Sequence, residues 1–207
     1  MGEGPSYKVP LKRRREGKTN YYKRYIYVLS GKPRLIVRYS NKYVQVQVAK
    51  ATILGDIIVA AAHSRELYKL FDWRAGGKNT SASYLTGLLA ALRAKYMGIE
   101  ICALDIGLKS PVKGSKIFAV AKAFRDAGIE VNVDEEFIPG EERISGKIIA
   151  EYAEKLYNED TEKYKRLFSD YLKRGLDPRE LPRHFEETLD KIIKYGEKLG
   201  VKVKISE

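Results

Sequence analysis

Hydrophobic and polar positions alternate over two neighbouring segments near the start of the chain. Residues 34–39 and 43–49 flank the turn sequence Ser40-Asn41-Lys42, and valine recurs at every second position of the second segment. Successive side chains of a strand point to opposite faces, so the pattern predicts an antiparallel hairpin with one apolar and one polar face. The polar face is expected to carry Arg34, Arg38, Tyr43, Gln45 and Gln47.

A helical pattern precedes this hairpin. Apolar residues recur at helical spacing over residues 22–29, and the Gly and Pro that follow are typical of a helix end. The spacing predicts a helix of two to three turns with Thr19 as its N-cap. It assigns Tyr25 to the buried side of this helix and places Lys23 and Arg24 on the other side.

Strand and helix patterns then alternate as far as residue 133. Continuous apolar runs predict buried strands, and longer periodic segments predict helices. Expected strands cover residues 57–62, 100–104 and 129–133, and expected helices cover residues 64–71, 81–96 and 117–127. A helix followed by a strand is half of an α/β unit, so the strand at 100–104 is expected to lie parallel to a neighbour. The pattern therefore predicts an α/β core on a mixed sheet that combines an antiparallel hairpin and third strand with α/β units.

The chain changes character after residue 133. An acidic stretch runs to residue 142, Pro139-Gly140 is a hinge candidate, and three amphipathic helical patterns follow with no strand pattern between them. We therefore expect three parts. These are a basic arm over residues 1–18, an α/β core over residues 19–133 and a helical extension over residues 134–207.

Positive charge is concentrated at one end of the chain. The formal net charge is +12, and the first fifty residues contain thirteen Lys or Arg against only Glu3 and Glu16. A run of like charges such as Lys12-Arg13-Arg14-Arg15 repels itself and is expected to order on a polyanion. A neutral body with a basic segment is typical of nucleic-acid-binding proteins.

Tyrosine and amide side chains are interleaved with these cations. Aromatic rings can stack on bases, while Arg, Asn and Gln donate hydrogen bonds to phosphates, bases and ribose hydroxyls. The principal candidate RNA-binding residues are Lys12, Arg13, Arg14, Arg15, Lys18, Tyr21, Tyr22, Lys23, Arg24, Arg34, Arg38, Ser40, Asn41, Lys42, Tyr43, Gln45 and Gln47. Further candidates lie in two loops beyond the hairpin and are Trp73, Lys78, Asn79, Lys109, Lys113 and Lys116.

The first of these loops contains two glycines ahead of a helix, but it does not predict nucleotide binding. The Walker pattern needs a Gly five residues before Gly77 and a Ser or Thr after Lys78, where the chain has Asp72 and Asn79. Two interpretations stay open for this loop, a plain helix start and a contact between the helix N-terminus and an RNA phosphate.

The sequence offers little for catalysis or metal binding. Its single cysteine, Cys102, excludes an intramolecular disulfide, and one Cys with two His argues against a zinc site. Two-metal hydrolysis needs convergent carboxylates, and nothing in the sequence predicts that Asp56, Asp105 and Asp126 converge. We therefore expect no enzyme activity, no cofactor and no small-molecule substrate. The apolar runs are too short to cross a membrane, and the cysteine usage suits the cytoplasm.

Five short motifs carry a resemblance to a known family. They are Arg13-Arg14-Arg15-Glu16-Gly17-Lys18-Thr19, Gly31-Lys32-Pro33-Arg34-Leu35, Ser40-Asn41-Lys42, Ala82-Ser83-Tyr84-Leu85-Thr86-Gly87-Leu88-Leu89 and Leu104-Asp105-Ile106-Gly107-Leu108. In order and spacing they closely resemble the large-subunit ribosomal protein family usually called L-eighteen, in its archaeal form, whose eukaryotic counterpart is called L-five. The resemblance covers nearly the whole chain and weakens after about Gly175.

The resemblance implies a ribonuclease H-like core and a structural role in the large ribosomal subunit, in the cytoplasm. It implies binding of 5S ribosomal RNA in the central protuberance, with 23S ribosomal RNA and neighbouring large-subunit proteins as further partners. The arm, the turn at residues 40–42 and the polar face of the hairpin would form the RNA surface. Two alternatives stay open. One is a nonspecific RNA- or DNA-binding protein that acts through its arm, and the other is a metal-dependent nuclease of ribonuclease H-like fold.

Overall fold

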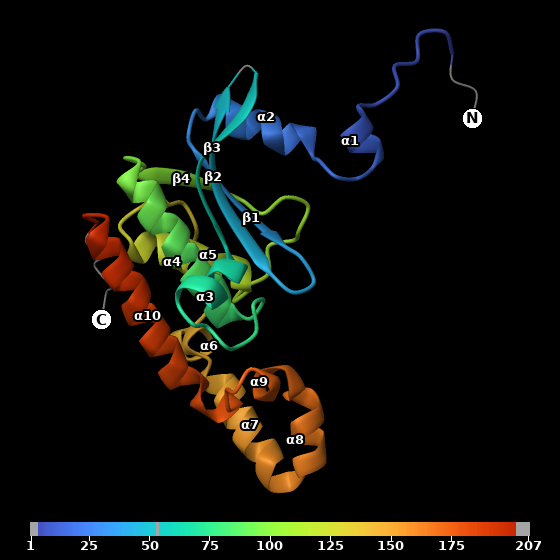
Figure 1. The fold of residues 1–207 in the computed structure, drawn as a ribbon. Helices are drawn as coiled ribbons and strands as arrows, with labels where there is room; N and C mark the ends of the chain where they lie inside the picture. The colour runs from blue at the N-terminus through green and yellow to red at the C-terminus, as the bar shows by residue number, and fades with distance from the viewer. Residues whose placement is uncertain (1–3, 53, 202–207) are drawn as a thin grey trace.

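The computed structural model describes residues 4–52 and 54–201, so the ends of the expected arm and extension lie outside the described residues. Five strands form one mixed sheet in the order β3-β2-β1-β4-β5 (Figure 1). The strands are β1 (Arg34–Tyr39), β2 (Val44–Thr52), β3 (Gly55–His63), β4 (Ile101–Asp105) and β5 (Glu130–Val131). Strand β2 is antiparallel to both β1 and β3, while β4 is parallel to β1 and β5 is parallel to β4. The expected mixed sheet is therefore confirmed.

The register of the hairpin follows the alternation in the sequence. Leu35 on β1 lies opposite Val48 on β2, and Val37 lies opposite Val46. All four side chains are at most 1% exposed, because this face of the sheet is covered by helices. Gln45 alternates with these valines and is exposed. The apolar pattern therefore determines which face of the hairpin enters the core.

Three helices accompany this core, namely α3 (Ser64–Leu70), α4 (Thr80–Tyr96) and α5 (Lys116–Asp126). Helix α4 packs against β2, β3 and α5, and its leucines are fully buried. A Cβ atom on Gly87 would lie 3.0 Å from the Cα of Val120, so glycine allows α4 and α5 to approach closely. Helix α4 is the centre of the core.

The burial of two expected elements differs from the sequence prediction. Strand β3 was expected to be buried throughout, but Ile57 is 60% exposed and Ile58 is 52% exposed. The reason is that β3 is an edge strand whose first half extends beyond α4. The assignment of Tyr25 to a buried side is also wrong, since Tyr25 is 62% exposed.

Helices make up most of the chain after residue 133. They are η1 (Glu135–Phe137), α6 (Glu141–Ser145), α7 (Lys147–Glu159), α8 (Thr161–Leu167), α9 (Ser169–Lys173), η2 (Pro178–Glu180) and α10 (Leu181–Lys198). Helix α10 packs along α4, while α7, α8 and α9 form a lobe at one end of the molecule (Figure 1). The middle helix of the prediction is divided at Phe168, which turns inward to pack with Leu156 and Tyr164.

The buried cysteine provides a test of this core. Cys102 on β4 is 1% exposed, and burial raises the pKa of its thiol to about 12. An exposed thiol has a pKa near 8.5 and reacts as the thiolate. We therefore expect the native protein at pH 8 to react with an aromatic disulfide reagent only at its rate of unfolding. The denatured chain should react at once. Rapid reaction of native protein would show that β4 is accessible in solution.

Candidate nucleic-acid interface

The basic segment begins with a single helical turn. Helix α1 (Lys12–Arg15) consists of four cations, all of them exposed. Arg13 Nε donates to the hydroxyl of Thr19 at 2.8 Å, which links this turn to the start of α2 (Tyr21–Leu29). The N-cap of α2 is Asn20 rather than Thr19, because the Asn20 side chain accepts from the Lys23 backbone N–H at 3.2 Å. Thr19 instead holds helical turn α1 through its hydrogen bond with Arg13.

Helix α2 crosses the face of the sheet opposite to α4. The Tyr27 hydroxyl donates to the Leu104 carbonyl oxygen at 2.8 Å, and burial raises the pKa of Tyr27. Sequence reasoning missed Tyr27 because it lies outside the apolar stripe that the spacing suggested. The signal for it is the spacing of Arg24 and Tyr27, which puts them on the same side of the helix toward the sheet. Tyr21 is half-buried and Tyr22 is exposed.

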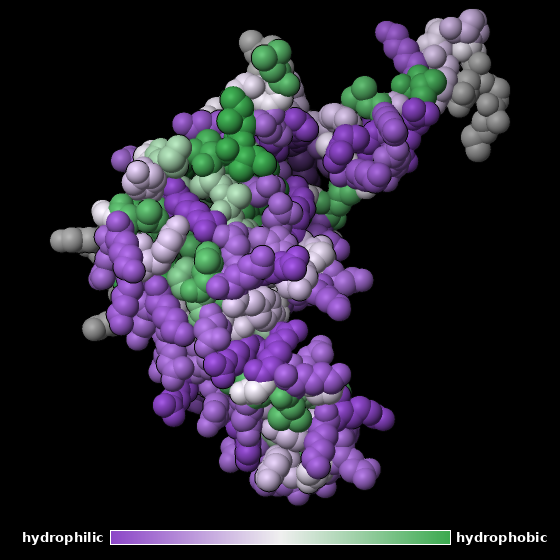
Figure 2. Space-filling model, in the orientation of Figure 1, coloured by the Kyte–Doolittle hydropathy of each residue, from purple (hydrophilic) through white to green (hydrophobic). Residues whose placement is uncertain are grey.

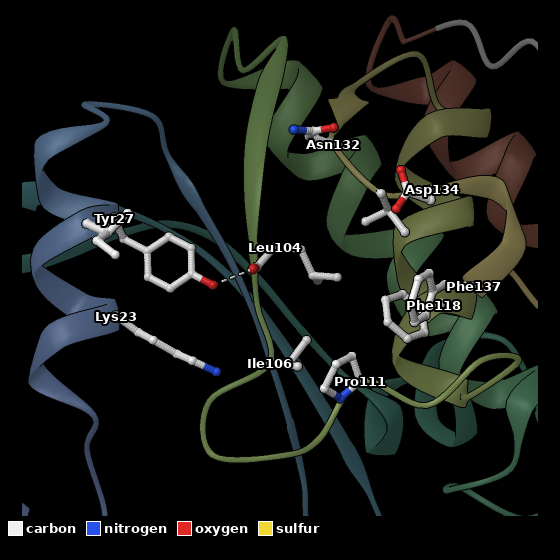
Figure 3. Close-up of a pocket in the computed structure, with 11 residues that line it drawn as sticks. Lys23, Tyr27, Leu104, Ile106, Pro111, Phe118, Asn132, Asp134 and Phe137 are labelled. Atoms are coloured by element: carbon white, nitrogen blue, oxygen red, sulfur yellow. Dashed lines mark hydrogen bonds between the residues drawn. The ribbon is translucent and has the colours of Figure 1, made fainter.

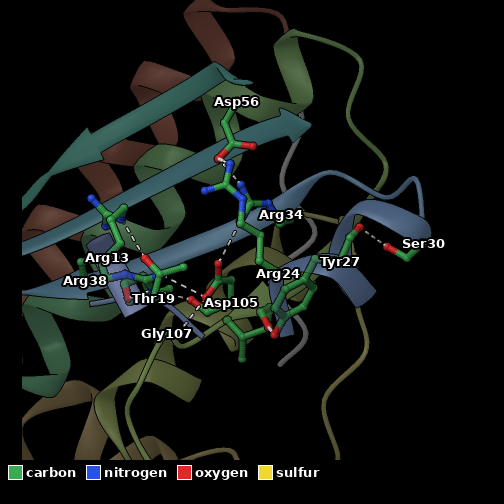
Figure 4. A network of polar contacts seen from close by, with 12 residues as sticks. Arg13, Thr19, Arg24, Tyr27, Ser30, Arg34, Arg38, Asp56, Asp105 and Gly107 are labelled. Atoms are coloured by element: carbon green, nitrogen blue, oxygen red, sulfur yellow. Dashed lines mark hydrogen bonds and ion pairs between the residues drawn. The ribbon is translucent and has the colours of Figure 1, made fainter. Parts of the chain in front are cut away.

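A network of arginines and carboxylates fastens α2 to β1, β3 and β4 (Figure 4). Arg34 forms ion pairs with Asp56 and, at 3.2 Å, with Asp105. Arg24 donates to Asp56 at 3.2 Å, and Arg38 donates to Asp105 Oδ1 at 3.0 Å and to the Asp105 carbonyl oxygen at 2.8 Å. The side chain of Arg34 is 5% exposed, so it does not lie on the accessible polar surface where sequence reasoning put it. Its ion pairs bury it, and it anchors the surface from within.

This network also explains the acidic residues that a nuclease would need. Asp56 and Asp105 do converge, but they converge on Arg34 and are neutralised there. Asp126 lies elsewhere and accepts from the Tyr84 hydroxyl at 2.6 Å. Within residues 4–52 and 54–201 no group of three or more His, Cys, Asp or Glu side chains could hold a metal ion.

The turn between β1 and β2 presents two polar side chains to solvent. The Ser40 N–H donates to the Tyr43 carbonyl oxygen at 2.9 Å, and the Tyr43 N–H donates to Ser40 Oγ at 3.0 Å. These bonds close the turn and leave Asn41 and Lys42 exposed. The Tyr43 ring is half-buried and lies 5.3 Å from the His63 ring between centroids. Residues 40–43 are called the hairpin tip below.

The hairpin tip rests on the loop at residues 72–79. A Cβ atom on Gly77 would lie 2.9 Å from the Lys42 carbonyl oxygen, so loop and tip are in direct contact. On its other side the loop is held by Arg174, which follows α9 and donates to the Ala75 carbonyl oxygen at 2.7 Å. Arg174 also donates to the Tyr68 hydroxyl at 3.1 Å. The C-terminal helices thus support the tip through this loop.

Most of the candidate residues in the two loops beyond the hairpin make contacts within the protein. Trp73 is 2% exposed and stacks on His184 of α10, with ring centroids 5.0 Å apart. Burial lowers the pKa of His184, and its neutral Nε2 accepts from the Arg74 N–H at 3.0 Å. Trp73 is therefore not placed to stack on a base. Asn79 is the N-cap of α4, where its side chain accepts from the Ala82 N–H at 2.7 Å.

The lysines of this set differ in accessibility. Lys116 donates to the Lys78 carbonyl oxygen at 3.3 Å, and burial lowers its pKa. Lys113 forms an ion pair with Glu136. Lys78 is half-buried and Lys109 is exposed. Lys109 and Lys113 thus keep the greatest access to solvent, although a carboxylate already faces Lys113.

The sequence of the chain matches known proteins over nearly its whole length. Residues 5–98 match the family model described as ribosomal large subunit proteins 60S L5 and 50S L18. A protein of Desulfurococcus amylolyticus named large ribosomal subunit protein uL18 is 58% identical over 93% of this chain and 97% of its own length. The chain belongs to the uL18 family. Relatives of the same name from Aeropyrum pernix and Staphylothermus marinus are 57% and 53% identical, over 90% and 97% of this chain and over 87% and 100% of their own lengths.

Membership of the uL18 family confirms three of the sequence predictions. The protein is a ribosomal protein of the large subunit, and RNA binding follows from the family. The uL18 proteins are structural constituents of the ribosome and not enzymes, which rules out the nuclease alternative. Among the helices that the structure describes, none is both long and apolar enough to cross a membrane.

Proposed function

We propose that this uL18 protein binds 5S ribosomal RNA and helps to attach it to the large subunit, where it forms the central protuberance. The observation that carries the proposal is the placement of the cations. The exposed turn α1, helix α2 and Arg38 converge on the sheet face that α4 leaves free. The hairpin tip adds Asn41 and Lys42 at the end of the same two strands.

The proposed mechanism has two parts. The arm neutralises phosphates, which gives affinity and a steep dependence on salt but carries no sequence information. The hairpin then fixes the register on a folded RNA by hydrogen bonds and stacking. Arg34 and Asp105 hold this surface from within through their ion pair, whereas most of the remaining principal candidates are more accessible to solvent.

The order and direction of the strands support a more specific description of the fold. We propose a ribonuclease H-like core, because three antiparallel strands are followed by two parallel strands on the far side of β1. We also propose that residues 1–18, 19–133 and 134–207 act as arm, core and extension. The extension supports the hairpin tip through Arg174.

Two apolar surfaces suit the other proposed partners, 23S ribosomal RNA and neighbouring large-subunit proteins in the cytoplasm. Figure 2 shows apolar side chains gathered over α2 and the adjoining end of β3, where Leu29 is 66% and Ile57 is 60% exposed. A groove of about 510 Å³ lies between α2, β4 and η1 and is lined by Leu104, Phe118 and Phe137 among others (Figure 3). Exposed apolar patches are typical of surfaces that become buried in an assembly.

A binding series over salt concentration tests the proposal. The purified protein, with and without residues 1–18, is titrated with 5S ribosomal RNA and with a control RNA of equal length. We expect a preference for 5S RNA that persists at high salt. Loss of the six arm cations should make the slope of log affinity against log salt shallower by up to roughly five. Equal affinity for both RNAs at every salt concentration would reduce the protein to a nonspecific binder that acts through its arm.

A substitution in the hairpin tip separates the two parts of the mechanism. We expect Asn41→Ala to weaken binding to 5S RNA more than binding to an unrelated duplex, by roughly fivefold to tenfold for a lost hydrogen bond. Asn41 is exposed, so the variant should fold normally. Lys69→Gln, on the exposed side of α3, is the control for a general change in surface polarity. Equal losses on both RNAs would contradict a specific hairpin surface.

A further inference from the structure

A small polar hollow lies where the arm, α2, β1 and the loop after β4 meet. It encloses about 200 Å³, and its lining includes Arg13, Lys18, Thr19, Lys23, Arg34 and Arg38. This volume would hold roughly six water molecules and is smaller than the usual pocket for a drug-sized ligand. A hollow of this size suits a small polar group.

The charges around the hollow favour an anion. Six of the lining residues are Lys or Arg and two are Asp. Asp56 and Asp105 are already paired with Arg24, Arg34 and Arg38. Arg13 and Lys23 form no ion pair with any residue that the structure describes. Figure 3 shows Lys23 extending from α2 toward the loop that follows β4.

One buried polar atom at the hollow has no partner. Arg34 is 4% exposed, and its Nε donates no hydrogen bond to any described residue. A buried donor without an acceptor costs about 1–3 kcal/mol. Thr19 and Asn20 also line the hollow. They directly precede α2, a helix of nine residues, so the N-terminus of this helix lies beside the hollow. Helix N-termini carry free N–H groups and a partial positive charge that favour phosphate.

We propose that this hollow binds one phosphate group of the RNA backbone. The proposal rests on the proposed function, since it names the RNA group that this part of the interface takes. Arg13 from the arm, Lys23 from α2 and Nε of Arg34 from β1 supply the donors. Because one wall of the hollow comes from the arm, the bound phosphate fixes the arm against the sheet. The arm then has one defined attachment point in addition to its diffuse attraction for RNA.

Nuclear magnetic resonance of the full chain tests the phosphate site. Inorganic phosphate is titrated while the Nε–H signal of Arg34 and the amide signals of Asn20 and Tyr21 are followed. We expect saturable shifts of these signals, and we expect Lys23→Gln and Arg13→Gln each to weaken phosphate binding by roughly fivefold. Lys69→Gln should leave binding unchanged. Shifts spread over the exposed lysines, without saturation at Arg34, would overturn the proposal.

A second titration, with RNA in place of inorganic phosphate, distinguishes an RNA phosphate from free phosphate. Addition of 5S ribosomal RNA should shift the Arg34 Nε–H signal in the same way, and Lys23→Gln should reduce the salt slope of RNA binding by about one. An Arg34 signal that responds to phosphate but not to RNA would overturn the assignment to the RNA backbone. If 5S and control RNA bind equally and both shift this signal, the phosphate site is supported while the 5S function fails.

Discussion

Asp105→Ala is expected to lower the free energy of unfolding by about 3–5 kcal/mol. The Asp105 carboxylate accepts from Arg34 and Arg38 and from the Gly107 N–H, at 2.8 to 3.2 Å. Arg34 is buried, so removal of the carboxylate leaves a guanidinium with only Asp56 as a counter-charge. Asp56 is shared with Arg24, so the buried Arg34 charge is then poorly compensated, which costs more than the ion pair contributes.

Urea denaturation of Asp105→Ala measures this loss, with Asp134→Ala as the control. Asp134 is an exposed carboxylate that caps no helix through its side chain, so its replacement should change stability by less than about 0.5 kcal/mol. The same preparation should bind 5S RNA more weakly, because Arg38 loses the partner that orients it. Equal stability of the two variants would show that the arginine network does not anchor the interface.

Gly77→Ala is expected to disturb the hairpin tip although the residue lies outside it. The added Cβ would lie 2.8 Å from the Tyr68 hydroxyl and 2.9 Å from the Lys42 carbonyl oxygen. Tyr68 is held in place, since its hydroxyl donates to the Ala75 carbonyl oxygen at 2.9 Å. The backbone at Lys42 must therefore move. Overpacking of this kind costs about 1–3 kcal/mol and should displace Asn41 and Lys42 from the positions in which we propose that they bind RNA.

The neighbouring glycine provides a matched control for this experiment. A Cβ on Gly76 would meet the Tyr171 hydroxyl at 3.4 Å, an ordinary van der Waals contact. Gly76→Ala should therefore leave both stability and 5S RNA affinity close to those of the native protein. Thermal unfolding and RNA titration of the two variants give the comparison. Equal affinities of the two variants for 5S RNA would contradict a supporting role of the loop.

Local patterns in the sequence predicted the elements of the core. The alternation in residues 44–48 determines which hairpin face is buried, because strand periodicity is a local property. The same patterns did not predict that the first half of β3 and Tyr25 are exposed. Whether a residue is buried depends on which other elements pack against it. Tyr25 and Tyr27 lie on the same helix. Tyr27 faces the sheet and donates to the Leu104 carbonyl oxygen, whereas Tyr25 faces solvent.

The charge count located the candidate interface but not the role of each residue in it. In the basic first quarter, the side chains of residues 12–15 and of Asn41 and Lys42 are exposed. Arg34 is instead an anchor, because its partners Asp56 and Asp105 are distant in sequence and no local pattern predicts their approach. Trp73 was misjudged for the same reason, since it is covered by His184, more than a hundred residues later. Contacts between residues that are far apart in the sequence determine which Lys and Arg side chains remain exposed and able to bind RNA.

The stacking of Trp73 on His184 also has a spectroscopic consequence. Trp73 is the chain's only tryptophan, and its ring lies nearly parallel to the imidazole, at 15°. Tryptophan fluorescence, excited selectively at the red edge of the absorption band, therefore originates from one site, between the loop that supports the hairpin tip and helix α10. A red shift of the emission signals that α10 has separated from this loop and admitted water. The native chain thus carries its own reporter for the attachment of its C-terminal helix, without any added dye.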